Sequence, residues 1–341
     1  MIIILASSAS DAHIQHVCDR LAQRGYEANV SRGVERTLIG AVGKLSDEDK
    51  SQLADQLQSL EYVERVVPIS RPYKLVSREG HDQTTIPLGD HILGSEAIIL
   101  MAGPCSVESE SQIVEAARAV KAAGAHVLRG GAFKPRTSPY DFQGHGLDGL
   151  KMLRTASLET GLPIITEVLD VRDVEAVCAH AQMLQIGTRN MANFQLLREV
   201  GQTHIPVMLK RGWASTIDEW LKAAEYLLAG GNHYVTLCER GIRTFEPSFR
   251  NTLDLAAVPA VKKLTHLPVV VDPSQGTGRW DMVEPMSLAA IAAGADGLLI
   301  EVHPDPETAW SDGAQSLSPS RFARFVERAR PVAVAVGRTL T

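Results

Sequence analysis

The first seventy residues combine short apolar runs with stretches of helical spacing. Ile14, Val17 and Leu21 recur every three or four positions, which places them on one face of a helix over 11–24. Ser46 precedes an acidic first turn and is the expected N-cap of a second helix. Strands are expected at 1–6, 27–31, 36–42 and 63–69. This βαββαβ order is that of the ferredoxin-like α+β fold. Because it contains no cluster of catalytic residue types, we expect a regulatory or assembly domain over 1–70.

The remainder of the chain has a different and longer period. Residues 71–96 are polar and interrupted by prolines and glycines, so we expect a linker there. Beyond it, apolar runs alternate with segments of helical spacing and begin near residues 97, 126, 163, 183, 206, 234, 268 and 297. Eight βα units over 97–341 predict a (β/α)8 TIM barrel, an α/β fold. An open doubly wound sheet is the alternative, but no GxGxxG pattern follows the first strand to favour it.

The composition fits a large folded core and argues against several functions. Of the 341 residues, 45% are hydrophobic and 22% are charged, and the net charge is −6. An acidic chain is not expected to bind nucleic acid, so any cationic site must be a local concentration. No apolar stretch has the length of a membrane span, and the opening MIIILA is shorter than a secretory signal. The four cysteines form no CxxC pair, and we expect a reducing cytoplasm.

Polar and ionisable residues follow each of the eight apolar runs. In a barrel of this kind the active site lies at the carboxyl ends of the strands, so these side chains are expected to converge on one mouth. They are Cys105, Ser106, Arg129, Glu167, Asp170, Arg189, Lys210, Arg211, Glu239, Arg240, Asp272, Ser274, Gln275, Glu301 and His303.

Two groups of residues point to different chemistry. The first, which we call the cationic floor, has donors for two phosphates or for a phosphate and a carboxylate. It consists of Arg129, Lys134, Arg136, Arg189, Lys210 and Arg240. Three of these lie in the glycine- and proline-framed segment RGGAFKPRTSPYDFQG, at 129–144. The second group combines the Cys105 thiol with the carboxylates of Glu301 and Asp312, with Asp272 as a further candidate, and suits a divalent metal. Taken alone, Cys105 would more often be a packed core thiol.

The motifs that carry these residues resemble those of one enzyme family. In chain order they are ERTLIGAVG, RPYKLVSRE, GPCSVES, RGGAFKPRTSPYDFQG, QIGTRNMANF, LKRG, LCERGIRTFE, RNTLDL, VDPS, EVHP and SDGAQSL. Nearly end to end, the chain is similar to 3-deoxy-D-arabino-heptulosonate 7-phosphate (DAHP) synthase, in the type I-beta form with an N-terminal ferredoxin-like domain. The resemblance implies condensation of phosphoenolpyruvate with erythrose 4-phosphate and water, with release of phosphate. This reaction is the first step of the shikimate pathway to aromatic amino acids.

The resemblance also implies roles for individual residues. The residues expected to bind substrate are Arg129, Lys134, Arg189, Lys210 and Arg240 for phosphoenolpyruvate, Arg136 and Thr137 for erythrose 4-phosphate, and Asp272. Cys105, Glu301 and Asp312 match three of the family's four metal ligands. The implied metal, Mn²⁺ or a similar divalent ion, would act as a Lewis acid on the aldehyde oxygen. Glu167 and Lys134 are the candidates for handling the attacking water and its protons.

One position departs from the family pattern. VDPS is normally followed by histidine, the fourth metal ligand, whereas this chain has Gln275. Glutamine offers an amide oxygen, a weaker and harder donor than an imidazole nitrogen. Gln275 is then either a weak ligand that shifts preference toward Mn²⁺ or Mg²⁺, or a hydrogen-bond partner of a ligating water. A third hypothesis is loss of catalysis, which would leave an amino-acid-binding regulator. The retained Cys105, Glu301 and Asp312 favour the first two.

Further alternatives concern substrate and regulation. A related phosphoenolpyruvate–aldose condensing enzyme, such as 3-deoxy-D-manno-octulosonate 8-phosphate synthase or a sialic-acid synthase, is the nearest rival, but the KPRTS motif and the N-terminal domain argue against it. The resemblance implies a homotetramer and feedback inhibition by tyrosine or phenylalanine at the small domain. Asn29, Ser31 and Arg36 are the residues expected near such an effector, although plain strand surface would explain them equally well.

Overall fold

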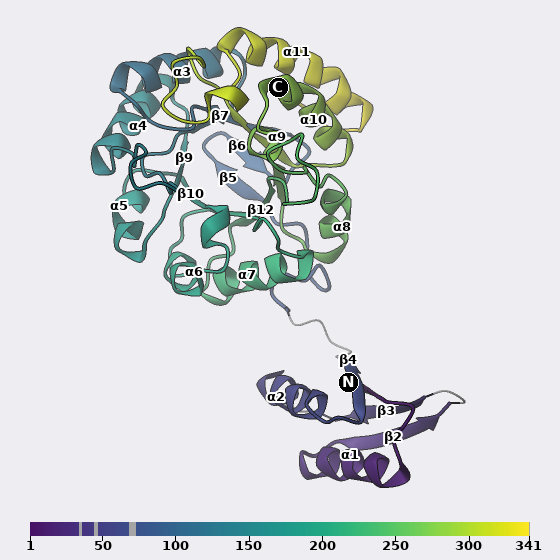
Figure 1. Cartoon of the computed structure of the whole chain (residues 1–341). Coiled ribbons are helices and arrows are strands. Elements are labelled where there is room, and N and C mark those ends of the chain that lie inside the picture. The colour runs from purple at the N-terminus through teal and green to yellow at the C-terminus, as the bar shows by residue number, and fades with distance from the viewer. Residues whose placement is uncertain (34–35, 44–46, 68–72, 341) are drawn as a thin grey trace. The chain divides into compact units, whose positions relative to one another are not determined.

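The computed structural model describes residues 1–33, 36–43, 47–67 and 73–340 of the chain (Figure 1). The chain divides into two compact units, Met1–Pro72 and Tyr73–Thr341. Each unit has a hydrophobic core of its own. No helix in the described part of the chain combines the length and the apolar character needed to cross a membrane.

The smaller unit is a four-stranded antiparallel sheet with two helices. Its elements are β1 (Ile2–Leu5), α1 (Asp11–Gln23), β2 (Glu27–Arg32), β3 (Thr37–Val42), α2 (Asp47–Gln58) and β4 (Val63–Val67). The sheet order β2-β3-β1-β4 confirms the predicted ferredoxin-like fold. Ile3, Leu21 and Leu57 are fully buried in its core. Ser10 caps α1, while the predicted cap of α2, Ser46, lies outside the described residues.

The larger unit is a closed parallel barrel, so the (β/α)8 prediction is confirmed and the open sheet is excluded. Its strands are β7 (Ile99–Gly103), β8 (Val127–Arg129), β9 (Ile164–Glu167), β10 (Met183–Ile186), β11 (Val207–Lys210), β12 (Val235–Glu239), β13 (Val269–Val271) and β14 (Gly297–Glu301). Each strand pairs with the next in sequence, and β14 pairs with β7 to close the ring.

Helices surround this ring of strands (Figure 1). They are α3 (Glu110–Ala122), α4 (Leu147–Thr160), α5 (Val174–Cys178), α6 (Phe194–Gly201), α7 (Ile217–Ala229), α8 (Ala257–Leu264), α10 (Trp280–Ala292) and α11 (Pro319–Ala335). A short extra helix, α9 (Pro273–Thr277), directly follows β13. In α7, Thr216 and Glu219 form a capping box, and Trp220 is buried against the barrel.

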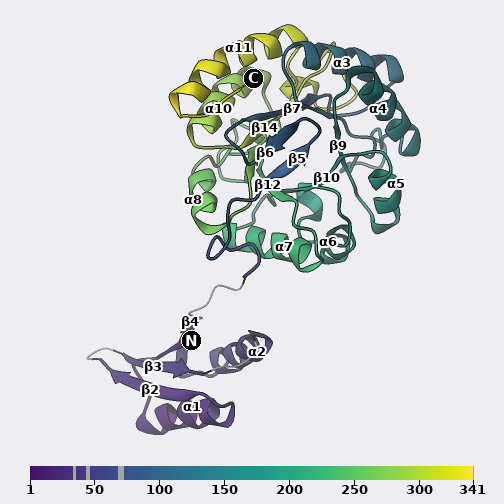
Figure 2. The same ribbon diagram turned by 180° about the vertical axis from the view of Figure 1, so that it is seen from behind.

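The expected linker at 71–96 requires a correction, because much of it is part of the barrel unit. Residues Ile86–Leu88 (β5) and His91–Leu93 (β6) pair as a small antiparallel sheet. The fully buried side chains of Ile86 and Leu93 join a cluster with inward-facing strand residues such as Met101. Seen from behind, β5 and β6 lie in the middle of the ring (Figure 2). They therefore form an apolar plug of the barrel interior. The surrounding prolines and glycines led to the prediction of a linker at these positions.

Candidate active site

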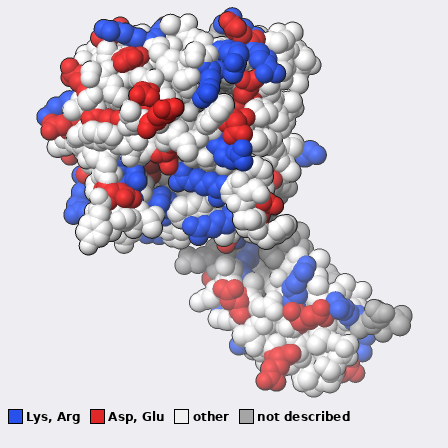
Figure 3. Space-filling model, turned by 45° about the horizontal axis from the view of Figure 1, so that its top comes forward, with Lys and Arg blue, Asp and Glu red and all other residues white. Residues whose placement is uncertain are grey.

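A cavity lies where the carboxyl ends of the barrel strands meet, as the strand-end residues predicted. Its lining residues are Arg129, Lys134, Pro135, Arg136, Thr137, Asp141, Glu167, Gln185, Gly187, Thr188, Arg189, Lys210, Trp213, Arg240, Arg250, Gln275 and Asp312. The whole cationic floor is thus brought to one cavity. On the face of the barrel visible in Figure 3, cationic and anionic side chains are interspersed. The positive charge of the cavity is therefore a local concentration in an acidic chain.

The deepest cations of the floor are held by buried carboxylates or amides. Arg129 pairs with Glu301 at 2.7 Å between Nη1 and Oε1. The Lys210 ammonium lies 2.5 Å from Asp272 Oδ2, and both side chains are at least 95% buried. The predicted substrate residue Asp272 therefore lies behind the cavity wall, where it positions Lys210.

Arg240 is buried with spare donor capacity. Arg240 is 3% exposed, and burial lowers the pKa of its guanidinium from the usual value. Nη2 donates to the side-chain oxygen of Gln275 at 2.7 Å. Nε and Nη1 are buried and have no hydrogen-bond partner among the described residues. Two orphaned N–H groups on a cation beside a cavity favour a bound anion, since buried donors are otherwise satisfied.

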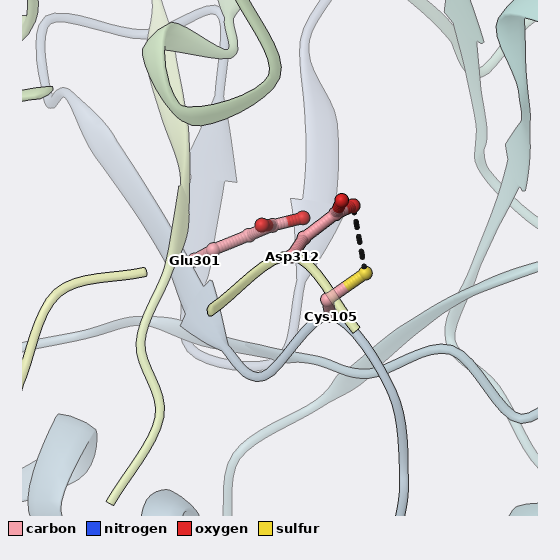
Figure 4. A group of neighbouring side chains, drawn as sticks. All are labelled: Cys105, Glu301 and Asp312. Atoms are coloured by element: carbon pink, nitrogen blue, oxygen red, sulfur yellow. Dashed lines mark hydrogen bonds between the residues drawn. The ribbon is translucent and has the colours of Figure 1, made fainter. Parts of the chain in front are cut away.

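The thiol and carboxylates predicted as metal ligands come together at the edge of this cavity (Figure 4). Donor atoms of Cys105, Glu301 and Asp312 all lie within 4.8 Å of one another. Glu301 ends β14, and Cys105 follows the neighbouring strand β7 by two residues. Asp312 has a φ of 52°, in the left-handed region that favours glycine and that aspartate also adopts more readily than most residues.

The protonation of these groups depends on their neighbours. Burial, and then the charge of Glu301, raise the pKa of the Cys105 thiol to about 11, while Lys134 acts in the opposite direction. Burial, the largest single effect, disfavours the Asp312 carboxylate, but Arg250, the hydrogen bond from Cys105 and the charge of Lys134 together outweigh it, so the pKa of Asp312 is lowered. One sulfur donor and two carboxylates fit a borderline divalent cation, because such ions accept both donor types. The three donor atoms lie close enough together to share one such ion.

Gln275 adjoins this group but presents its nitrogen to it. Nε2 donates to Glu301 Oε1 at 3.1 Å and to Asp312 Oδ2 at 3.2 Å. The amide oxygen, which is the atom able to bind a metal, instead accepts from Arg240. The predicted fourth ligand is therefore in the expected place with its donor atom turned away.

Glu167 ends β9 inside the cationic floor. Burial raises the pKa of its carboxyl, and the surrounding cations, Lys134 first among them, oppose the shift. Its Oε2 accepts from Gln185 Nε2 at 3.2 Å. A carboxyl that keeps its proton above the ordinary range, within a pocket of cations, suits proton transfer.

The rim of the cavity carries the remaining predicted substrate residues. Arg136 pairs with Asp141 at 3.1 Å. Arg189 is exposed and donates from Nη2 to Thr137 Oγ1 at 3.2 Å. Its guanidinium also stacks on Trp213, with 5.0 Å between the guanidinium carbon and the ring centre.

Other residues of the site were absent from the sequence-based set. Arg250 donates to Asp312 Oδ1 at 2.9 Å and to Gln315 Oε1 at 2.8 Å. Gln315 in turn donates to Glu301 Oε2 at 2.7 Å. Both residues lie within motifs already noted, RNTLDL and SDGAQSL. Gln185 could have been found from its sequence context, because it is a polar residue within the apolar run of β10, which is buried throughout.

Nine of the fifteen strand-end residues do not line the cavity, and three of these nine, Arg211, Glu239 and His303, belong to other interactions. Arg211 pairs with Glu239 at 3.0 Å, which supports the neighbouring loop. His303 is buried, with Nε2 3.3 Å from a carboxylate oxygen of Glu108. The predicted convergence was therefore correct for the cationic floor and too broad for the complete set.

A closed (β/α)8 barrel with a cation-lined cavity, beside one thiol and two carboxylates that could hold a divalent metal, is typical of an enzyme that handles anionic substrates. Residues 66–335 match the model of the DAHP synthetase I family, and residues 1–71 match the DAHP synthase ferredoxin-like domain. The chain belongs to the DAHP synthetase I family. This confirms the predicted enzyme class and its reaction, the condensation of phosphoenolpyruvate with erythrose 4-phosphate at the first step of the shikimate pathway.

Individual relatives support the same placement. The chain is 47% identical to a phospho-2-dehydro-3-deoxyheptonate aldolase of Thermotoga maritima, with 99% of each chain covered. A crystal structure of that Thermotoga enzyme superposes with a TM-score of 0.94 at 45% identity, covering 100% of this chain and 99% of the other. A 2-dehydro-3-deoxyphosphooctonate aldolase of Syntrophotalea carbinolica is 32% identical over 66% of this chain and 86% of its own. The relative named for the rival substrate is thus more distant and covers less of the chain.

Proposed function

We propose that the deep part of the cationic floor binds the phosphate and carboxylate of phosphoenolpyruvate. The single observation that carries this assignment is the pair of buried, unpartnered N–H groups of Arg240. Lys210 and Arg129 line the same cavity and add positive charge to it. The exposed rim, with Arg136 and Thr137, would then take the phosphate of erythrose 4-phosphate. Two anions fixed at opposite ends of one cavity would bring the enol carbon to the aldehyde carbon in near-attack geometry.

The reaction then needs one carbon–carbon bond, one water and one leaving group. The enol carbon of phosphoenolpyruvate attacks the aldehyde carbon, and the aldehyde oxygen takes a proton. Water adds at the second carbon of phosphoenolpyruvate, and cleavage of the carbon–oxygen bond expels phosphate. We assign the exchange of protons to Glu167 and Lys134, because both line the cavity and the charge of Lys134 opposes the rise that burial causes in the pKa of Glu167.

We assign a divalent cation, Mn²⁺ or a similar ion, to Cys105, Glu301 and Asp312. When bound there, such an ion supplies Lewis-acid polarisation of the aldehyde oxygen. The two carboxylates suit Mn²⁺, and the thiol disfavours Ca²⁺, which takes oxygen donors alone.

The test is phosphate release from phosphoenolpyruvate and erythrose 4-phosphate by chelator-stripped protein, with and without added Mn²⁺. Metal-dependent release is expected, and arabinose 5-phosphate should compete poorly with erythrose 4-phosphate. Arg240→Met should raise the KM for phosphoenolpyruvate, while the exposed helix residue in Arg154→Met serves as a matched control. Release that survives chelation would overturn the metal assignment. No release from folded protein with any divalent ion would favour the regulator hypothesis.

We further propose that the small domain binds an aromatic amino acid and that the enzyme assembles as a homotetramer. The match to the ferredoxin-like domain of the family supports both. Asn29 and Ser31 are exposed on β2, and Arg36 pairs with Glu64 at 2.9 Å. Titration calorimetry with tyrosine and phenylalanine, together with sedimentation of the full chain, tests the two proposals. An absence of heat with both amino acids would remove the effector.

A further inference from the structure

The Gln275 amide lies between partners of opposite hydrogen-bonding character. On one side is the guanidinium of Arg240, which only donates, 2.7 Å from the amide oxygen. On the other side are carboxylate oxygens of Glu301 and Asp312, which accept from the amide nitrogen at 3.1 and 3.2 Å. Because no other orientation satisfies all three contacts, the chemistry of the neighbours fixes which way the amide points.

This orientation opposes direct ligation of a cation by Gln275. The amide nitrogen has no lone pair to give to a metal, and it faces the carboxylates of the metal group. Use of the oxygen as a ligand requires the amide to turn over, which would set its N–H groups against the Arg240 guanidinium. Two donors would then face each other, and Arg240, at 3% exposure, would lose its only described side-chain acceptor.

An anion in the cavity lowers the cost of turning the Gln275 amide. The orphaned Nε and Nη1 of Arg240 offer it two donors, so the guanidinium gains an acceptor that replaces the Gln275 oxygen. The turned amide would then donate its N–H to the same anion. Its oxygen would be free to face the cation beside Glu301 and Asp312.

We propose that Gln275 is a positioning residue that couples the two halves of the active site, so that an anion bound at Arg240 turns the amide and completes the cation site. This inference rests on the proposed phosphate-binding role of the cavity. Histidine at the same position would behave differently, since an imidazole nitrogen can ligate without an amide rotation. The substitution of His by Gln would thus convert a permanent ligand into a conditional one.

The experiment measures Mn²⁺ affinity by titration calorimetry with and without inorganic phosphate, in the native protein and in Gln275→His. Attraction between anion and cation tightens Mn²⁺ binding in both proteins. In the native protein, phosphate should tighten Mn²⁺ binding by a further factor of about ten or more. This factor corresponds to the free energy of a hydrogen bond to a charged group. Gln52→His, on an exposed position of α2, controls for the added imidazole.

Co²⁺ gives a second readout that does not depend on activity. Phosphate should change the intensity of the cobalt d–d bands in the native protein, because a ligand is added, and should leave the thiolate charge-transfer band of Cys105 in place. Gln275→Glu, which presents oxygen to both sides, should also lose the phosphate dependence. It keeps the test valid if Gln275→His does not fold.

Equal phosphate effects in native and Gln275→His proteins would overturn the inference. So would a native cobalt spectrum that already shows the full ligand set and does not respond to phosphate. The proposed function is judged separately, by phosphate release from the two substrates. Release with equal phosphate effects would refute only the coupling, whereas unequal effects without release would refute only the proposed function.

Discussion

Lys134 places its ammonium nitrogen 2.9 Å from the sulfur of Cys105 and 2.8 Å from the carbonyl oxygen of the same residue. The contact links the RGGAFKP loop to the end of β7. It also opposes burial and the charge of Glu301, which together raise the pKa of the Cys105 thiol to about 11. The lysine therefore has two effects, one on the shape of the site and one on the fraction of thiolate available to a metal.

Cation binding should tighten with rising pH, because the thiol gives up its proton to become a ligand. Below a pKa of about 11, one released proton corresponds to about tenfold in affinity for each pH unit. Lys134→Met should raise the thiol pKa further and weaken Co²⁺ binding at neutral pH. The thiolate charge-transfer band followed against pH measures both effects. Lys151→Met, on the surface of α4, is the control. Affinity independent of pH over the neutral range would show that Cys105 is not a ligand.

Gly187→Ala should displace Glu167 without unfolding the protein. A β-carbon at this position would lie 1.9 Å from Glu167 Oε1, and the carboxyl can turn aside because it is the end of a flexible side chain. If Glu167 moves protons, phosphate release should fall by about 10²–10⁴-fold, the usual share of general acid–base catalysis. The free energy of unfolding in urea should be close to that of the native protein.

Glu167→Gln provides the matched comparison. Burial raises the pKa of Glu167, so its titration should shape the pH profile of kcat above the range of an ordinary carboxyl. Both Gly187→Ala and Glu167→Gln should abolish this feature of the profile. A normal profile in either variant would assign the feature to another group.

Local patterns account for what the sequence predicted well. Each βα unit carries its own apolar run and helical spacing, so strands such as β11 and β14 were located without tertiary information. Their last residues, Lys210 and Glu301, lie at the carboxyl end of a parallel strand and face the same mouth of the barrel. Family motifs then supplied their chemistry.

The sequence predicted least well where distant segments meet. The plug formed by Ile86 and Leu93 was not predicted, because its strands are only three residues long. These side chains are buried by residues of the barrel strands, which are distant in the sequence. The orientation of Gln275 depends on Arg240, which is 35 positions away in the chain. A side chain whose partners come from separate strands cannot be oriented from a linear pattern.

Asp272 should be more important for stability than its place beside the active site suggests. Oδ2 pairs with Lys210, and Oδ1 caps α9 by accepting from the backbone N–H of Gln275 at 2.8 Å. Asp272→Ala would leave a lysine charge buried without a partner, a loss of about 3–5 kcal/mol. Asp272→Asn keeps an oxygen for the cap and should cost less. Urea denaturation ranks the variants, and stability equal to the native protein in both would mean that Lys210 finds another partner.

Leu93→Ala should destabilise the barrel through the plug at its interior. Leu93 is fully buried among inward-facing strand residues, whereas its neighbour Ile92 on the same strand is 49% exposed. Truncation of a buried leucine in a packed core costs about 2–5 kcal/mol, because the cavity left behind is not refilled. Ile92→Ala removes a similar side chain from the opposite face and should cost far less. Urea unfolding of the two variants measures the difference. If the two substitutions cost the same free energy of unfolding, residues 86–93 only lie against the barrel. If Leu93→Ala costs more, these residues are part of the barrel core. They would then also support the strand ends that carry the cationic floor.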